Sequence, residues 1–461
     1  MHDLVFTGGH LLDPANNTDG PADLAIRDGR ISEVGRVTTG ARRTIEVAGH
    51  YVLPGIIDSH THLSRHFGSA EGHRMVAATG VVTALDMAGE IEDLARDLKG
   101  GGAGLNIAYL HPLVPGATLP SSGPTKDEIA GAVDRALTSG AIGIKLLGGH
   151  YPLTPEATAQ AVEEAARRRC YVAFHVGTTA TGSDIRGLEE ALDLAAGRPI
   201  HIAHVNSYCR GQVTGDPVAE ARRALDLLAA HPSAVSESYL SVYNGTSARC
   251  RDGVPASAVT KTCLRLGGHE QSEKGLEAAI RAGYARIHRE QGGEIVLASP
   301  PDGLETWRAL ETEAGVSFPV NHIPSAILLA TARSEGLFVI DGLSTDGGAI
   351  PRNFLVRHGL MLVQMGAWTL RDFVLKASVN PARMLSLPAK GHLGVGADAD
   401  VTVVDLEAGR ARWSVARGRL VLAEGRVEGR GGTLLVSPDG ETAARSRGLD
   451  HEVIHREGWR G

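Results

Sequence analysis

The sequence predicts an α/β protein, a (β/α)8 TIM barrel with a small β-sandwich formed by the N- and C-terminal segments. Short apolar segments alternate with helical patterns through the middle of the chain, whereas both ends consist of short strands and turns. Polar residues directly follow several of the central strands. Strands that alternate with helices are typical of parallel α/β folds, whose active sites lie at the C-terminal ends of the strands.

Residues 1–52 read as short apolar strands, and the turn RDGR between two of them is a hairpin signal. Residues 391–461 show the same pattern, in the stretches ADVTVVDLE, RWSVARGRLVLAEGRV and GGTLLVS. Because two β-rich segments at opposite ends of a chain can pair, we expect them to form one small sandwich. A polar tail is expected from about residue 440.

Residues 53–390 are expected to form the barrel. Its eight strands are predicted in the stretches GIIDSHTH, GVVTALDM, LNIAYLHPLV, AIGIKLL, YVAFHVG, PIHIAHVNS, SAVSESYL and LFVIDGLSTD. Helical patterns such as TPEATAQAVEEAARRR and DPVAEARRALDLLAAH separate most of them. The seventh and eighth strands are instead separated by about residues 242–335, which exceed an ordinary connection and are predicted to be a functional insertion.

The composition narrows the class of protein. The formal net charge is −7 over 461 residues, without a basic patch rich in aromatic residues, so we expect no nucleic-acid partner. No apolar run approaches the roughly 18 residues of a membrane span, and the start MHDLVFTGGHLLDP does not resemble a signal peptide. The four cysteines lack CxxC spacing, so the sequence indicates neither a disulfide framework nor a zinc site made of cysteines. We therefore expect a cytoplasmic homo-oligomer that acts on a small-molecule substrate and has no membrane partner.

The first predicted barrel strand ends in two histidines, His60 and His62. Residues i and i+2 of a strand share a face, so both imidazoles project together. Such a pair binds a metal ion if further ligands converge on it. A histidine pair in a polar loop explains this spacing equally well, so other parts of the chain must decide.

Residue types that bind metal ions also end four later strands: Lys145, His175, His204 and Asp346. Taken singly, each has an ordinary structural explanation, as a solvated lysine, a core histidine or a helix N-cap. With the histidine pair they place six such residues at the ends of five strands, which meet at one mouth in a barrel. His201 is expected to be structural, because it is out of phase with His204 and both cannot face the site.

Lys145 lies within the apolar strand AIGIKLL. Burial of an ammonium group lowers its pKa from about 10.4. A neutral amine beside a metal ion can react with carbon dioxide to form a carbamate, whose oxygens can bridge two divalent ions. The alternative is a lysine whose stem packs in the barrel while its amine reaches solvent.

The chain resembles the amidohydrolase superfamily of metal-dependent hydrolases over nearly its whole length. The resemblance is carried by PGIIDSHTH, the strand lysine, the single histidines of strands five and six, the strand-eight aspartate, and SVNPARMLSLPAKGHLGVGADADVTVVD. The metal ligands that it implies are His60, His62, Lys145, His175, His204 and Asp346. Carbamylated Lys145 (N6-carboxylysine) would bridge two divalent ions, which we expect to be zinc.

The chain resembles two branches of the superfamily. The strand-four lysine is similar to that of the cyclic amidases, such as hydantoinases, dihydroorotases and isoaspartyl dipeptidase. The stretch VSESYLSVYNGTSA and the long insertion resemble N-acyl-D-amino-acid deacylases. The cysteine ligand that those deacylases carry after strand two is absent from LDMAGE. Ser64 stands where dihydroorotases carry an arginine, and Arg65 follows it.

The predicted activity is hydrolysis of an amide-type C–N bond, other than a peptide bond, in a small carboxylate-bearing substrate: an N-acyl amino acid, a cyclic amide or a dipeptide. Two divalent ions can hold a hydroxide between them and polarise the substrate carbonyl. Asp346 is expected to accept the water proton and deliver it to the leaving nitrogen. An esterase, a mononuclear deaminase of the same superfamily and a non-catalytic hydantoinase-like scaffold remain as alternatives. Deaminases carry a His-x-x-Glu pattern that FHVGTT lacks.

Five further residues are predicted to contact the substrate or the developing charge: His150, Tyr151, Arg210, Tyr239 and Arg352. His150 or Tyr151 could donate a hydrogen bond to the oxyanion, although both could equally shape the turn after the lysine strand. Arg210 and Arg352 are candidates for binding the substrate carboxylate in a bidentate way. Tyr239, at the end of strand seven, is expected to line the same mouth.

Overall fold

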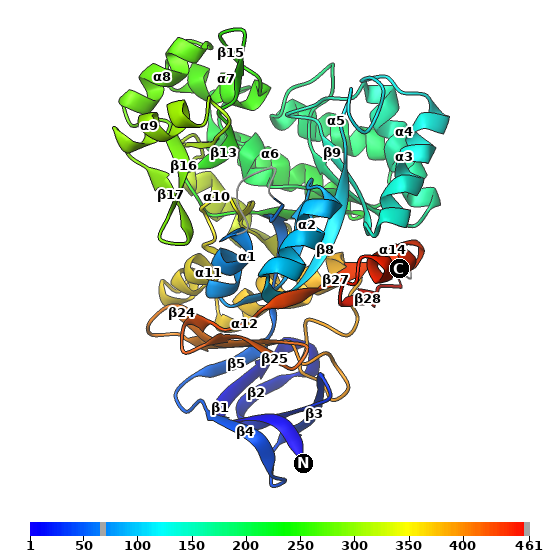
Figure 1. The fold of residues 1–461 in the computed structure, drawn as a ribbon, viewed down its shortest axis with the longest axis vertical. Helices are drawn as coiled ribbons and strands as arrows, with labels where there is room; N and C mark the ends of the chain where they lie inside the picture. Colours follow the sequence, from blue (N-terminus) through cyan, green and yellow to red (C-terminus); the bar gives the residue numbers. More distant parts are fainter. Residues whose placement is uncertain (65–70, 456–461) are drawn as a thin grey trace.

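The computed structural model describes residues 1–64 and 71–455 (Figure 1). Arg65 therefore lies outside the described residues. Figure 1 shows three regions: a β-rich region at the bottom, a central barrel, and a group of helices and short strands at the upper left. No helix within the described residues is long and apolar enough to cross a membrane.

The two ends of the chain form one nine-stranded sheet, which we call the terminal β-domain. Its strands are β1 (His2–Asp13), β2 (Thr18–Arg27), β3 (Arg30–Gly35), β4 (Ala41–Glu46), β5 (Tyr51–Pro54), β23 (Val401–Asp405), β24 (Arg410–Ala416), β25 (Arg419–Ala423) and β26 (Arg426–Val427). Antiparallel pairing of β5 with β23 joins the N-terminal and C-terminal halves. Buried residues from both halves, such as Phe6, Leu24 and Trp413, pack into a core of their own. The predicted pairing of the two ends is thus confirmed.

The eight strands of the barrel run in parallel and in chain order. They are β6 (Ile56–His62), β7 (Val81–Met87), β8 (Ala103–Leu113), β9 (Gly143–Leu147), β10 (Tyr171–His175), β11 (Ile200–Ile202), β12 (Ala234–Ser238) and an interrupted eighth strand, β21 (Gly342–Leu343) with β22 (Gly347–Gly348). β21 pairs with β12 and β22 pairs with β6, so residues 342–348 close the barrel. The predicted (β/α)8 fold is confirmed.

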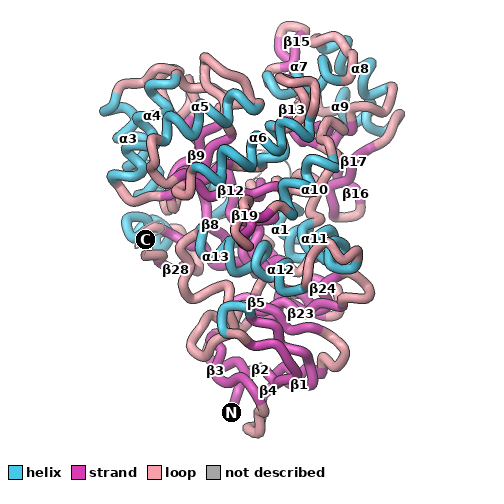
Figure 2. Tube along the Cα trace, turned by 180° about the vertical axis from the view of Figure 1, so that it is seen from behind, coloured by secondary structure: helices cyan, strands magenta, loops and turns pink. Residues whose placement is uncertain are grey.

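A helix follows each barrel strand (Figure 2). These helices are α1 (Glu71–Ala78), α2 (Ile91–Gly100), α3 (Lys126–Ser139), α4 (Pro155–Arg167), α5 (Ile185–Ala195), α6 (Pro217–Ala230), α10 (Ile323–Thr331) and α11 (Leu355–Gln364). α4 and α6 begin with a proline that directly follows a capping residue, Thr154 or Asp216. Proline suits this position because the first helical N–H has no partner within the helix. α12 (Leu370–Val374), a π-helical turn (Leu375–Val379) and α13 (Asn380–Met384) lead towards the terminal β-domain.

The predicted insertion forms a unit of its own between β12 and α10, which we call the inserted segment. It contains β13 (Asn244–Ser247), β14 (Cys250–Arg251), β15 (Val254–Pro255), α7 (Ala258–Leu266), α8 (Glu273–Arg281), β16 (Arg286–Gln291), β17 (Glu294–Ala298), α9 (Asp302–Ala309) and β18 (Gly315–Phe318). Trp307 and Phe318 belong to its separate apolar core. The insertion ends earlier than predicted, because α10 packs against α6 as the seventh barrel helix. The hairpin of β19 (Arg333–Ser334) and β20 (Leu337–Phe338) follows.

One C-terminal strand departs from the sequence prediction. β27 (Gly431–Val436), the stretch expected in the sandwich, pairs in parallel with the first half of β8 instead. β9 pairs only with Leu110–Leu113 of β8, which leaves the edge of Ala103–Ala108 open. β27 covers this edge, with α14 (Glu441–Ser446) and β28 (His451–Val453) beside it (Figure 1). An uncovered strand edge would expose unpaired backbone groups, which explains the pairing.

Candidate metal centre

The histidine pair of β6 lies beside an aspartate of the neighbouring eighth strand. His60 and His62 are 1% and 7% exposed. Their Nε2 atoms lie 3.3 Å and 2.9 Å, respectively, from Oδ1 of Asp346. One potential ligand atom from each of the three residues lies within 4.8 Å of the other two. Imidazole nitrogens and a carboxylate oxygen are suitable ligands for a divalent ion such as zinc, so this set fits one ion.

Asp346 reaches the histidines because the eighth strand is interrupted at that point. Its backbone is left-handed, with φ 48°, and its N–H donates to the carbonyl of His60 at 2.9 Å. The preceding residue is fixed as well, because Thr345 Oγ1 donates to Asp58 Oδ2 at 2.6 Å. Burial raises the pKa of Asp58 to about 7, although the hydrogen bond from Thr345 acts to lower it. Backbone strain of this kind is common at functional sites.

His175 and His204 extend the cluster on its other side. The ring centroid of His204 lies 5.1 Å from that of His60 and 4.5 Å from that of His175. Nδ1 of His204 is buried and has no hydrogen-bond partner among the described residues, which suits a ligand atom. Burial holds the pKa of both imidazoles well below the usual value. Neutral imidazole is the form that binds metal ions.

Lys145 lies inside the barrel, as its apolar strand predicts, and is 1% exposed. Its amine donates to the thioether sulfur of Met87 at 3.2 Å. Burial lowers the pKa of Lys145 to about 8, although Glu237 and Asp346 act in the opposite direction. Within the described part of the chain, no carboxylate lies in ion-pair distance of this amine. Met87 is the last residue of β7. It lies in LDMAGE, the stretch that lacks the cysteine ligand of the resembled deacylases.

Glu237 is a site residue that sequence reasoning missed. It is the penultimate residue of β12, is fully buried, and accepts hydrogen bonds from His60 Nδ1 and from the backbone N–H of His204, both at 2.6 Å. The hydroxyl of Ser344 donates to its other oxygen. A carboxylate on Nδ1 leaves Nε2 of His60 for a metal ion and fixes the ring orientation. A signal was present, since SAVSESYL carries a carboxylate at the same strand end as the ligands.

Glu237→Gln should therefore weaken zinc binding by about 10- to 100-fold, the range for a lost carboxylate partner of a ligand histidine. Competition with a chromophoric chelator measures this affinity directly. Asp398→Asn is a matched control, because Asp398 is a buried carboxylate paired with Lys390 away from the barrel mouth. Equal loss of zinc affinity in both variants would show general destabilisation rather than a role for Glu237 at the site.

His201 faces the barrel interior together with His204, so the prediction that both cannot do so was wrong. His201 Nε2 lies 3.8 Å from Glu237 Oε1, the same oxygen that accepts from the backbone of His204. Both residues turn inwards because β11 ends at Ile202 and His204 has a left-handed backbone, with φ 33°. His201 Nδ1 also contacts the Tyr171 hydroxyl at 2.9 Å. These two contacts join His201 to β10 and β12, and its structural role stays a prediction.

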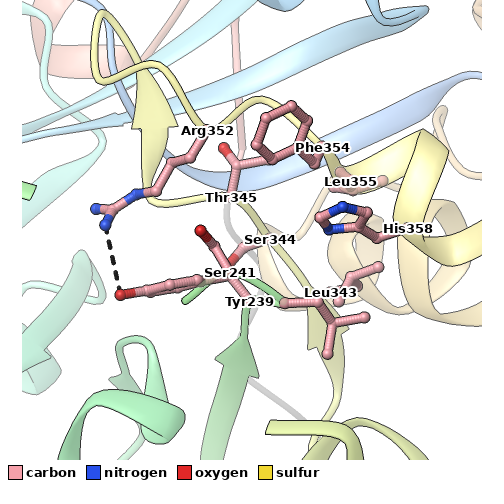
Figure 3. A pocket seen from close by; sticks show the side chains of 10 residues that line it. Tyr239, Ser241, Leu343, Ser344, Thr345, Arg352, Phe354, Leu355 and His358 are labelled. Carbon is pink, nitrogen blue, oxygen red and sulfur yellow. Dashed lines mark hydrogen bonds between the residues drawn. The ribbon is translucent and has the colours of Figure 1, made fainter. Parts of the chain in front are cut away.

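Arg352 and Tyr239 lie beside Asp346 rather than open to a ligand. The guanidinium of Arg352 forms an ion pair with the Asp346 carboxylate, and its Nε donates to the Asp346 carbonyl at 2.6 Å. Figure 3 shows Arg352 directed towards the Tyr239 hydroxyl, 3.4 Å from Nη1. Burial alone would raise the pKa of Asp346, but Arg352 and His60 hold it well below the usual value. The cavity beside this pair is small, about 10 Å³.

A larger cavity of about 290 Å³ opens beside His175. Arg210 lines it, whereas the side chain of Tyr151 is not among its walls and the residue is 45% exposed. The His150 ring lies 4.9 Å from that of His175, so the turn after β9 does reach the site. A Cβ at Gly149 would lie 2.1 Å from His175 Nε2, so only glycine fits this close approach.

Residues 322–429 match the amidohydrolase family. A dihydroorotase from Geobacter metallireducens is 22% identical over 449 residues, covering 90% of this chain and 92% of that protein. An allantoinase from Deinococcus radiodurans is 26% identical over 450 residues, covering 88% and 87%. These similarities confirm the predicted resemblance to the amidohydrolases.

A solved structure of D-aminoacylase has the same fold, with a TM-score of 0.68 at 20% identity, covering 94% of this chain and 99% of that one. That protein is described as having a binuclear metal center, with one-metal activation and second-metal attenuation. The fold is thus shared with that protein.

Proposed function

We propose that this relative of the amidohydrolases is a binuclear metal-dependent hydrolase acting on carbon–nitrogen bonds other than peptide bonds. The observation that carries the proposal is the set of His60, His62 and Asp346, whose ligand atoms lie within 4.8 Å of one another at the mouth of the barrel. The ring of His204 lies beside that of His60, the ring of His175 lies beside that of His204, and Lys145 interacts electrostatically with Asp346. The dihydroorotase and allantoinase similarities favour the same class of reaction.

Two divalent ions, with zinc expected, would be held by His60, His62 and Asp346 on one side and by His175 and His204 on the other, and Lys145 as a carbamate would bridge them. When bound, such a pair supplies a nucleophile from water at neutral pH and polarises the substrate carbonyl. The buried amine of Lys145, without a carboxylate partner among the described residues, supports this assignment.

The chain's own residues would handle the proton. Asp346 is buried against Arg352, whose charge favours the carboxylate form. In this proposal the carboxylate accepts a proton at one oxygen and returns it to the leaving nitrogen. An amine is a poor leaving group unless it is protonated, so amide hydrolysis needs this step. His150, whose ring lies 4.9 Å from that of His175, would donate to the developing oxyanion. Tyr239, whose hydroxyl lies 3.4 Å from Arg352 Nη1, would line the same mouth.

The proposed substrate is a small amide that carries a carboxylate: an N-acyl amino acid, a cyclic amide or a dipeptide. Both predicted anchors are arginines near the barrel mouth, Arg210 at the large cavity and Arg352 at Asp346. A guanidinium binds a carboxylate through two parallel hydrogen bonds. The large cavity, about 290 Å³, approaches the size range of small-molecule sites.

One experiment tests the metal content and the reaction together. Protein loaded with zinc in the presence of bicarbonate should contain close to two ions per chain by elemental analysis. The same sample should hydrolyse at least one member of a panel of N-acyl-D- and N-acyl-L-amino acids, cyclic amides and dipeptides. One tightly held ion, unchanged by added bicarbonate, would contradict the binuclear site. Cleavage of esters alone would contradict the amide assignment.

A further inference from the structure

The large cavity is built partly by the barrel and partly by the inserted segment. Gly148, His175 and Ser207 contribute from the C-terminal ends of barrel strands and the segments that follow them. Val259 and Thr262, from α7 of the inserted segment, form the opposite wall. The cavity therefore connects the ligand cluster, through His175, with a surface that the barrel alone does not provide.

Arg210 lies in the wall of this cavity and is held by two asparagine side chains of the inserted segment. Its Nε donates to Asn321 Oδ1 and its Nη2 donates to Asn244 Oδ1, both at 2.9 Å. Both asparagines are themselves buried, at 8% and 6% exposure. Neutral acceptors orient the guanidinium but leave its positive charge uncompensated. Among the described residues, Arg210 has no carboxylate in ion-pair distance.

Two acidic side chains of these loops, Glu220 and Asp184, have other partners. Glu220 is fully buried and accepts the backbone N–H groups of Gly211, Val213 and Thr214, which fixes the loop that carries Arg210. Asp184, also in the cavity wall, caps α5 by accepting backbone N–H groups through Oδ1. The loop is thus held rigid without neutralising the arginine.

Arg352, the other predicted anchor, differs in this respect. Its charge is compensated by Asp346, its Nη1 donates to the Tyr243 carbonyl at 3.1 Å, and its carbon Cζ lies 4.7 Å from the centroid of the Tyr239 ring. It is 3% exposed. A substrate carboxylate bound there would have to displace the carboxylate of Asp346, a residue needed for the reaction.

We propose that Arg210 binds the carboxylate of the substrate and that the inserted segment sets the substrate class by holding it, whereas Arg352 positions Asp346. This inference rests on the proposed function. It narrows the substrates to amides whose amine half carries a free carboxylate, such as N-acyl amino acids, and it disfavours uncharged cyclic amides.

The test compares N-acetyl-D- and N-acetyl-L-methionine with their carboxamides, on zinc-loaded wild type and on Arg210→Ala, Arg210→Lys and Arg223→Ala. Arg210→Ala should raise KM for the better carboxylate substrate by about 10- to 100-fold, the value of a charged hydrogen bond, with a smaller effect on kcat. The carboxamides should be unaffected. Arg210→Lys should be intermediate, because an ammonium keeps the charge without the planar fork. Arg223→Ala is the matched control, since that arginine pairs with Glu189 on the surface.

Calorimetric binding of the same N-acetyl amino acids to the metal-free protein separates this proposal from the proposed function. Binding that prefers the carboxylate and is lost in Arg210→Ala, without any hydrolysis by the zinc-loaded enzyme, would retain the anchor and reject the activity. Equal binding of carboxylates and carboxamides by the wild type, binding of neither, or unchanged affinity in Arg210→Ala would overturn the proposal.

Discussion

Asp346→Asn should lower turnover by about 100- to 10,000-fold, the range that general acid–base catalysis contributes. The carboxylate lies 2.9 Å from His62 Nε2 and 3.3 Å from His60 Nε2, so it belongs to the proposed ligand set where the reaction would take place. An amide of the same shape neither carries the negative charge nor accepts a proton at neutral pH. Turnover and zinc content must be measured on the same samples, because Asp346 is also a proposed ligand.

A second effect of this substitution must be separated from catalysis. Asp346 and Arg352 are both buried, so losing one charge leaves the other uncompensated, which costs about 3–5 kcal/mol of stability in buried pairs. The double variant Asp346→Asn with Arg352→Gln removes both charges and should recover thermal stability without recovering turnover. If Asp346→Asn retains turnover within tenfold of wild type at full zinc content, Asp346 is not the proton shuttle.

The local pattern of the sequence predicts most of the barrel because strand length, apolar content and helix caps are local properties. The histidine pair of β6 and the lysine of β9 lie where alternation along a strand requires. The pairing of β27 with β8 could not be predicted in this way. It depends on the unequal lengths of β8 and β9, which only the assembled sheet reveals.

The partners of the site residues were likewise beyond local pattern. The interval of three residues between His201 and His204 argued against a shared face, but strand periodicity no longer applies once β11 has ended. Glu237 was overlooked because a carboxylate in a strand has meaning only beside the imidazole that it contacts. The choice between Arg210 and Arg352 depends on which guanidinium already has a carboxylate, and this contact spans distant parts of the barrel.

Lys145→Ala should reduce turnover by orders of magnitude and lower the zinc content, because it removes the proposed bridging carbamate. The side chain is 1% exposed, and its amine donates to the sulfur of Met87 inside the barrel. Alanine leaves a space there that a short carboxylic acid can enter, so added formate, acetate or propionate should restore part of the activity and of the second zinc ion. Elemental analysis and initial rates, measured across a series of acid concentrations, follow both quantities.

Two variants make this experiment specific to the bridge. Lys145→Met fills the space without an amine, so it should lose activity as Lys145→Ala does but should not respond to carboxylic acids. Lys376→Ala is the matched control for burial, because Lys376 is fully buried and donates to the Ile340 carbonyl at 2.5 Å, outside the ligand cluster. It should lower stability while zinc content stays at the wild-type value. A normal rate and two zinc ions in Lys145→Ala would instead mean that the lysine only fills the barrel, and that two ions need no bridge from this strand.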